Sequence, residues 1–254
     1  MLDLAGSPDP SRLVINRWVS DQTHARIPNL LAPGSITGAT VLVLTNAVYF
    51  IAGWSAPFDR ARTANAGSHR LDGTVVQAPT MSEAADMGYA EGPGWQAVDM
   101  PYQGDQSSML VIVPAAGTFA DFERSLDADR FEAIVSALTP HRVTLALPRF
   151  TFRRNASVAT ALRVLGMTDA FLPGVADLSG IDGSRRLFIQ DVIHEGYIAV
   201  DEDGTEAAGA TAVIIGVTGL PPQATLSVDR PFLFAIRSAN GAVLFLGRAV
   251  DPAG

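Results

Sequence analysis

Residues 200–222 read VDEDGTEAAGATAVIIGVTGLPP, a composition that fits neither a surface loop nor a buried strand. The stretch opens with the acids Asp201, Glu202 and Asp203 and carries no charge after Glu206. A surface loop normally holds more polar groups, whereas a buried strand normally holds larger apolar ones. This composition predicts a segment that can exist in both environments.

The alternation of side chains in this stretch supports the same interpretation. In an extended strand, every second side chain points the same way. The set that begins at Thr205 and Ala207 contains no charge, whereas Glu206 belongs to the other set. A bulky or charged residue at Thr205 or Ala207 would cost about 1–3 kcal/mol to bury. The alternative is a permanently exposed linker, which would not need the β-branched residues found in 211–218.

Helical patterns are predicted at three places. The first covers residues 9–31, where Asp9 is the expected cap and Pro10 suits the first turn. Its expected apolar face consists of Leu13, Ile15, Trp18 and Val19. The other two helical patterns lie in residues 119–138 and 155–167.

Strand-like runs dominate the rest of the chain. Residues 37–54 form a near-continuous apolar run, which suits a strand buried on both faces. Further strands are predicted in residues 94–104, 107–117 and 141–152. Residues 232–249 predict a hairpin around Asn240-Gly241, with a type I′ turn. The pattern predicts an α+β fold of multi-stranded sheets with helices, in one domain covering residues 1–254.

Composition and charge argue against several classes of function. The net charge is −8, so nucleic acid is not an expected partner. The chain has no cysteine, and its 4 histidines lack metal-site spacing, so no metal is expected. A serine-hydrolase elbow and a phosphate-loop lysine are both missing from the sequence, which argues against an enzyme. No apolar run approaches the roughly 18–20 residues that span a bilayer, and residues 1–12 do not read as a signal peptide.

Several separated motifs together resemble the serpins, a family of serine protease inhibitors. The segment 204–212, GTEAAGATA, resembles the hinge of a serpin reactive-centre loop, and 226–236, LSVDRPFLFAI, resembles the C-terminal signature. The segment 44–54, LTNAVYFIAGW, resembles the strand of the large central sheet, and 194–208, HEGYIAVDEDGTEAA, resembles the strand that leads into the loop. The resemblance implies a soluble, extracellular suicide-substrate inhibitor of a serine protease that needs no cofactor, with residues 201–222 as hinge and exposed loop.

The resemblance also implies where a protease would cut. The residue before the scissile bond is the fifteenth of the run that starts at the hinge glycine, Gly204, which gives the bond Thr218-Gly219. A register shifted by one residue, to Val217-Thr218, remains an alternative. A neutral, β-branched side chain suits proteases of elastase type, whereas trypsin-like enzymes need a basic residue. The implied hinge residues are Gly204, Thr205, Glu206, Ala207, Ala208, Gly209 and Ala210.

Three further sites follow from the resemblance. Asn46 and His194 match the polar pair at the shutter, where the central sheet must part; the alternative is a pair of satisfied core residues. Trp54 matches the aromatic residue at the breach, where insertion starts; the alternative is that Trp54 only packs in the core. Glu202 matches the acid at the base of the loop, with Arg149 at the position of its usual lysine partner, or Glu202 is an unpaired surface acid. An arginine can bind a carboxylate in a bidentate manner, which a lysine cannot.

The chain departs from the family at its start. A complete serpin carries a block of helices and strands before the helix that begins here at Asp9, and that block has no counterpart in the sequence. Without it, apolar sheet surface and an open edge would be exposed. Residues 1–254 alone are therefore expected to be prone to aggregation and to be cleaved without trapping a protease. The alternatives are a fragment of a working inhibitor and a non-inhibitory serpin.

Overall fold

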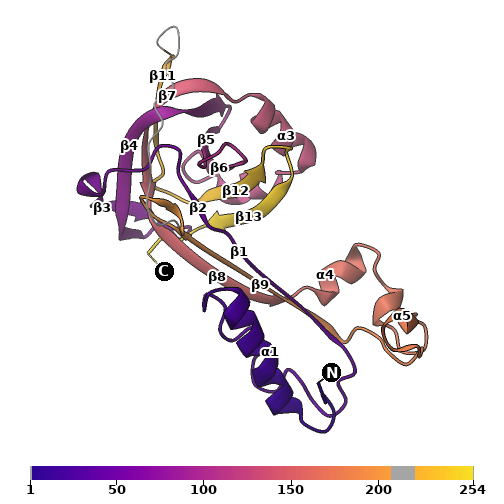
Figure 1. The fold of residues 1–254 in the computed structure, drawn as a ribbon. Helices are drawn as coiled ribbons and strands as arrows, with labels where there is room; N and C mark the ends of the chain where they lie inside the picture. The colour runs from indigo at the N-terminus through magenta and orange to yellow at the C-terminus, as the bar shows by residue number, and fades with distance from the viewer. Residues whose placement is uncertain (1, 207–220, 254) are drawn as a thin grey trace. The chain divides into compact units, whose positions relative to one another are not determined.

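The structure is a computed structural model that describes residues 2–206 and 221–253 (Figure 1). The predicted scissile bond Thr218-Gly219 lies outside the described residues, as do the predicted hinge residues Ala207, Ala208, Gly209 and Ala210. The chain divides into two compact units: Met1–Phe50 with Phe152–Ile198, and Ile51–Thr151 with Ala199–Gly254.

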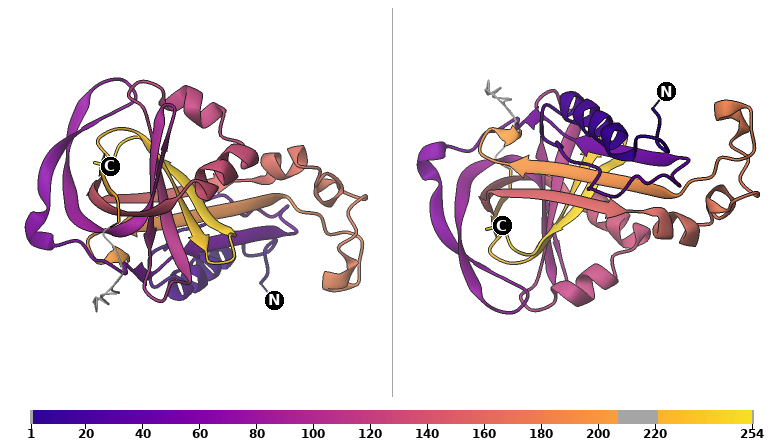
Figure 2. Two further views of the ribbon diagram at one scale, coloured as in Figure 1. Left: turned by 90° about the horizontal axis from the view of Figure 1, so that it is seen from above. Right: turned by 90° about the horizontal axis from the view of Figure 1, so that it is seen from below.

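The first unit is built on a pair of parallel strands that are far apart in the sequence. Strand β1 (Val43–Tyr49) pairs with β9 (Asp191–Val200) from Val43 opposite Asp191 to Tyr49 opposite Tyr197. Strand β8 (Phe150–Ser157) also pairs with β9, and Figure 2 shows the two running together. The unit's helical elements are α1 (Pro8–Gln22), α4 (Ala159–Val164), η2 (Asp169–Phe171) and α5 (Ser179–Asp182).

Helix α1 buries a face that differs from the predicted one. Leu13 and Trp18 are 53% and 60% exposed, so the predicted apolar face is wrong for these two residues. The buried residues of the helix are Ser11, Arg12, Asn16 and Val19. The side chain of Asn16 bonds both the N–H and the C=O of Leu31, at 2.8 and 2.9 Å, so the connection after the helix satisfies this buried polar group.

The predicted start of helix α1 is also corrected. The helix begins at Pro8 after Ser7, and Asp9 lies inside its first turn, where it accepts a hydrogen bond from Arg12 Nε at 2.7 Å. The helix ends at Gln22, well before residue 31. Strand β1 differs as well, because Leu44 is 39% exposed and the strand is not buried on both faces.

The second unit contains the larger sheet. In the described chain this sheet has the order β11-β7-β4-β5-β6-β12-β13, and β3 pairs with β4. The strands are β3 (Ala64–His69), β4 (Val75–Gly92), β5 (Trp95–Pro101), β6 (Ser107–Pro114), β7 (Thr139–Pro148), β11 (Gln223–Ser227), β12 (Phe232–Ser238) and β13 (Val243–Ala249). Helices α2 (Phe119–Arg124) and α3 (Ala128–Ser136) pack on β5, β6 and β12 through Phe119, Phe122, Ile134, Leu110 and Leu233.

Three short elements complete the second unit. Strand β10 (Gly204–Thr205) pairs in antiparallel fashion with β2 (Ala52–Gly53), and Thr205 pairs with Val200 at the end of β9. The 3₁₀ helix η1 is Arg60–Arg62. The α+β fold class is therefore confirmed, with helices and mixed sheets in the described residues.

The hairpin between β12 and β13 is present, but its predicted turn type is wrong. A type I′ turn needs positive φ at both central residues. Gly241 has a φ of 88°, whereas Asn240 is not among the residues with positive φ. No helix in the described residues is long and apolar enough to cross a membrane.

Candidate functional site

A stacked aromatic pair organises the end of the second unit where β9 turns into β10. The rings of Trp54 and Tyr102 lie 4.5 Å apart with an interplanar angle of 10°, and both side chains are almost completely buried. Trp54 donates from its indole Nε1 to the carbonyl of Asp201 and from its backbone N–H to the carbonyl of Asp203, both at 2.9 Å. These two bonds fix the turn 201–203 against Trp54.

Thr205 is buried in the same place. Its exposed fraction is 0%, and its hydroxyl lies 2.6 Å from the hydroxyl of Tyr102. Burial raises the pKa of Tyr102 above its ordinary value, so the phenol stays protonated and can donate this hydrogen bond. The predicted hinge residues Gly204 and Thr205 therefore lie inside the protein.

Glu202 and Arg149 are paired. The side chain of Glu202 is 0% exposed, and its Oε1 accepts hydrogen bonds from Arg149 Nε, at 2.9 Å, from Arg149 NH2 and from Thr63 Oγ1. Both arginine nitrogens contact one oxygen, so the contact is not the two-oxygen fork that an arginine can make. Burial disfavours the charged form of Glu202, but the hydrogen bonds from Arg149 and Thr63 outweigh it and lower the pKa of this carboxyl.

Asn46 and His194 meet in the first unit. They lie directly opposite each other in the β1–β9 register, with Asn46 Oδ1 3.0 Å from His194 Nδ1. An amide oxygen only accepts, so His194 Nδ1 donates in this bond. Beside them, a groove of about 360 Å³ runs between α1 and β1, lined by Trp18, Asn46 and Tyr49 among others.

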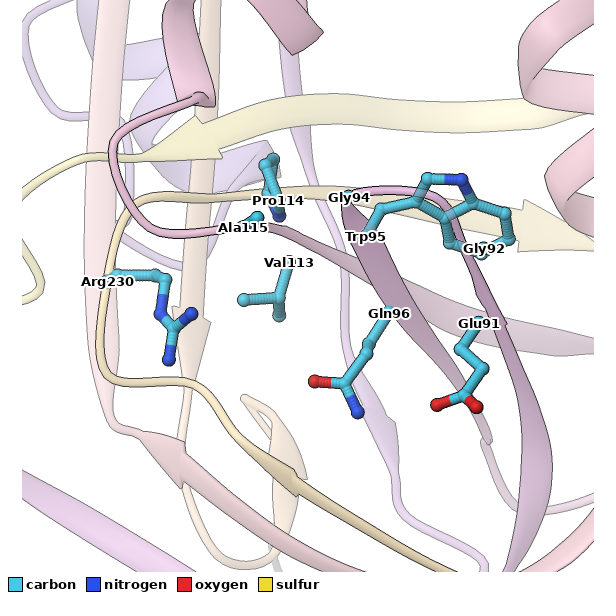
Figure 3. Close-up of a pocket in the computed structure, with 9 residues that line it drawn as sticks. All are labelled: Glu91, Gly92, Gly94, Trp95, Gln96, Val113, Pro114, Ala115 and Arg230. Carbon is cyan, nitrogen blue, oxygen red and sulfur yellow. The ribbon is translucent and has the colours of Figure 1, made fainter.

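A second concave site lies in the larger unit, and no sequence motif predicted it. This pocket has a volume of about 450 Å³ and is lined by Glu91, Trp95, Gln96 and Arg230 (Figure 3). The hydroxyl of Tyr89 donates to Glu91 and accepts from Gln96, each at 2.7 Å, which orients both side chains. The pocket shares no lining residue with the cluster of Trp54, Tyr102 and Thr205.

A comparison with protein families identifies the chain. The model described as "Serpin (serine protease inhibitor)" matches residues 1–252, almost the whole chain. The chain belongs to the serpin family.

Individual relatives agree with this membership. The chain is 38% identical to an uncharacterized serpin-like protein of Thermococcus kodakarensis over 256 residues, covering 99% of this chain but 59% of the relative. It is 34% identical to the leukocyte elastase inhibitor of Homo sapiens, of which it covers 69%. Among solved structures, native protease nexin-1 with heparin is similar with a TM-score of 0.85 and 31% identity, covering 99% of this chain and 68% of that one.

The predicted site residues of this serpin fall into two groups. Asn46 and His194 belong to the first unit, whereas the turn 201–203, with Trp54 and Arg149, belongs to the second. Within each group the side chains are in contact, directly or through the turn. Their roles as shutter and breach remain predictions.

Two features of the serpin were missed at the level of sequence. Tyr102 stands in an ordinary-looking MPYQG, and no local pattern indicates that it meets Trp54 and Thr205. Glu195 is 3% exposed and accepts from Asn155 Nδ2 at 2.7 Å, while Asn155 also donates to the carbonyl of Leu30 at 2.8 Å. The presence of the charged Glu195 within the apolar strand sequence HEGYIAV could have indicated this buried group.

Proposed function

We propose that this serpin inhibits a serine protease by acting as its suicide substrate. The serine oxygen of the protease attacks the carbonyl carbon of Thr218, the bond to Gly219 breaks, and the amine of Gly219 leaves with a proton. Thr218 stays bound to the protease as an ester. The cleaved loop then enters the sheet between β1 and β9, and the protease is held before the ester hydrolyses. Loop insertion is a known behaviour of serpins and a described case of strand addition.

The observation that carries this proposal is the start of a strand at β10. Gly204 and Thr205 are buried and already run antiparallel to β9, and the backbone N–H of Glu206 donates to the carbonyl of Ala199 at 3.1 Å. A strand that continued in this direction would follow β9 back along its length. Residues 191–197 of β9 are occupied by β1, so β1 and β9 would have to separate to admit it.

The target is proposed to be a protease of elastase type. A neutral, β-branched residue at the predicted position 218 fits a primary pocket that accepts small apolar side chains. A relative named leukocyte elastase inhibitor supports the same choice. An extracellular location and the absence of a cofactor stay predictions from the family.

The test is to incubate the full-length protein with an elastase-type protease and to analyse the mixture on denaturing gels. We expect a covalent complex with the mass of the protease plus the N-terminal part of the inhibitor. Mass spectrometry of the released peptide should show an N-terminus at Gly219. Complete cleavage without any complex would overturn the proposal and identify a non-inhibitory serpin.

A further inference from the structure

Thr205 is held in the interior by short strand pairings with β2 and β9 and by its side chain. Strands β10 and β2 have two residues each, so the backbone ladder that holds Thr205 is short. The side chain adds the hydrogen bond between its hydroxyl and that of Tyr102, at 2.6 Å. Two-residue pairings are weak by themselves, so this side-chain bond contributes a large share of what holds Thr205 in place.

The next residue marks the end of the strand. Glu206 has a φ of 50°, in the left-handed region that a strand does not use. A longer inserted strand would require Glu206 to change to an extended conformation. Strand β10 therefore ends at Thr205, and the hydroxyl of this last strand residue is hydrogen-bonded to that of Tyr102.

We propose that Tyr102 is a positioning residue, which holds Thr205 inside before cleavage and thereby raises the fraction of protease encounters that end in trapping. This inference rests on the proposed function. Insertion of the cleaved loop competes with hydrolysis of the ester. A loop whose first residues are already paired in the sheet starts to insert without having to form these pairings, so insertion is faster. If Thr205 were displaced, the same acylated protease would more often hydrolyse its ester and escape.

The hydroxyl pair allows a test that separates positioning from packing. Tyr102→Phe keeps the ring stacked on Trp54 but leaves the buried Thr205 hydroxyl without this partner. Thr205→Val removes the Thr205 hydroxyl from this bond. Either change alone removes the hydrogen bond and keeps one of its two hydroxyls, whereas the double variant removes both hydroxyls, which is close to neutral.

The experiment compares wild type, the two single variants and the double variant. The first readout is the number of inhibitor molecules consumed per protease trapped, which should rise about five- to tenfold in each single variant. It should return to within about twofold of wild type in the double variant. The control is Tyr89→Phe, which removes a tyrosine hydroxyl that bonds Glu91 and Gln96 in the same unit and should leave the ratio unchanged.

The second readout does not depend on inhibition. Trp54 is stacked on Tyr102, so acrylamide quenching of its fluorescence reports solvent entry when Thr205 leaves, in a background that carries Trp18→Phe and Trp95→Phe. Quenching should increase in both single variants and fall again in the double variant. If the wild type traps no protease, the proposed function is wrong. The quenching of Trp54 fluorescence in the four proteins then tests by itself whether Tyr102 positions Thr205. A Tyr102→Phe variant that matches wild type, or a double variant worse than both single variants, overturns the inference.

Discussion

Asn46 and His194 lie opposite each other in the parallel β1–β9 ladder, with Asn46 Oδ1 3.0 Å from His194 Nδ1. A strand inserted between β1 and β9 would separate this pair. If the proposed insertion takes place, this bond would oppose it, as the predicted shutter role requires.

Asn46→Ala should destabilise the intact protein by about 0.5–1.5 kcal/mol, because a side-chain hydrogen bond across the ladder is lost. The cleaved protein should show no such loss, since insertion has already parted the two residues. Thermal unfolding of wild type and variant, each before and after loop cleavage, measures both quantities. An equal loss in the two forms would mean that the pair is not separated by insertion.

Under the proposed function, Thr205→Arg should give a serpin that is cleaved as a substrate and traps no protease. Position 205 is 0% exposed, so an arginine there would have to leave the interior or bury its charge without a partner. The loop should still be cut at the normal rate, and the covalent complex should disappear from denaturing gels. Thr205→Ser keeps the hydroxyl and serves as the matched control, which should still trap. Efficient complex formation by the arginine variant would show that the hinge assignment is wrong.

The predicted scissile bond can be tested although it lies outside the described residues. Thr218→Arg should move inhibition from elastase-type to trypsin-like proteases, because their primary pocket pairs a basic residue with a buried acid. Mass spectrometry of the wild-type fragment should give an N-terminus at Gly219. A fragment that starts at Thr218 would establish the one-residue shift, and cleavage only at Arg230 would reject the whole register.

The pair of Glu202 and Arg149 should make stability depend on acid. The pKa of Glu202 is lowered in the folded protein, from an ordinary value of 4.5, so its ionised form stabilises the fold. This contribution is complete above the unfolded pKa and is lost as the pH falls through the lowered folded value. The difference in unfolding midpoint between wild type and Glu202→Gln should therefore shrink from about pH 6 to about pH 3. A difference that stays constant over this range would show that the charge of Glu202 does not stabilise the fold.

The strands were easier to predict than the faces they bury. Runs such as 107–117 are apolar along their length and appear as strands, because burial in a sheet favours such residues. The buried face of helix α1 was predicted wrongly from the apolar pattern. Its Arg12 and Asn16 are buried because they hydrogen-bond to the backbone of Leu31, a contact that hydrophobic periodicity cannot predict. Strand β4 was missed because Pro79 and several alanines interrupt the β pattern.

The candidate site shows a similar division. Asn46, His194, Trp54, Glu202 and Arg149 were found through family resemblance, and the structure adds their contacts. Tyr102 could not be found in this way, because its importance depends on two residues that only the folded chain brings to it. The burial of Thr205 in the uncleaved chain likewise depends on the β9–β10 turn and not on local composition.

The separation of β1 and β9 is the central claim, and a reversible covalent lock tests it most directly. The chain has no cysteine, so the double variant Leu44→Cys and Val192→Cys would carry a single possible disulfide between two residues that face each other in the ladder. Adjacent strands place such residues within the Cα separation that a disulfide accepts. The measurement is the yield of covalent protease complex with the lock oxidised and then reduced. The account predicts cleavage without complex when oxidised and restored trapping when reduced; equal trapping in both states would contradict it.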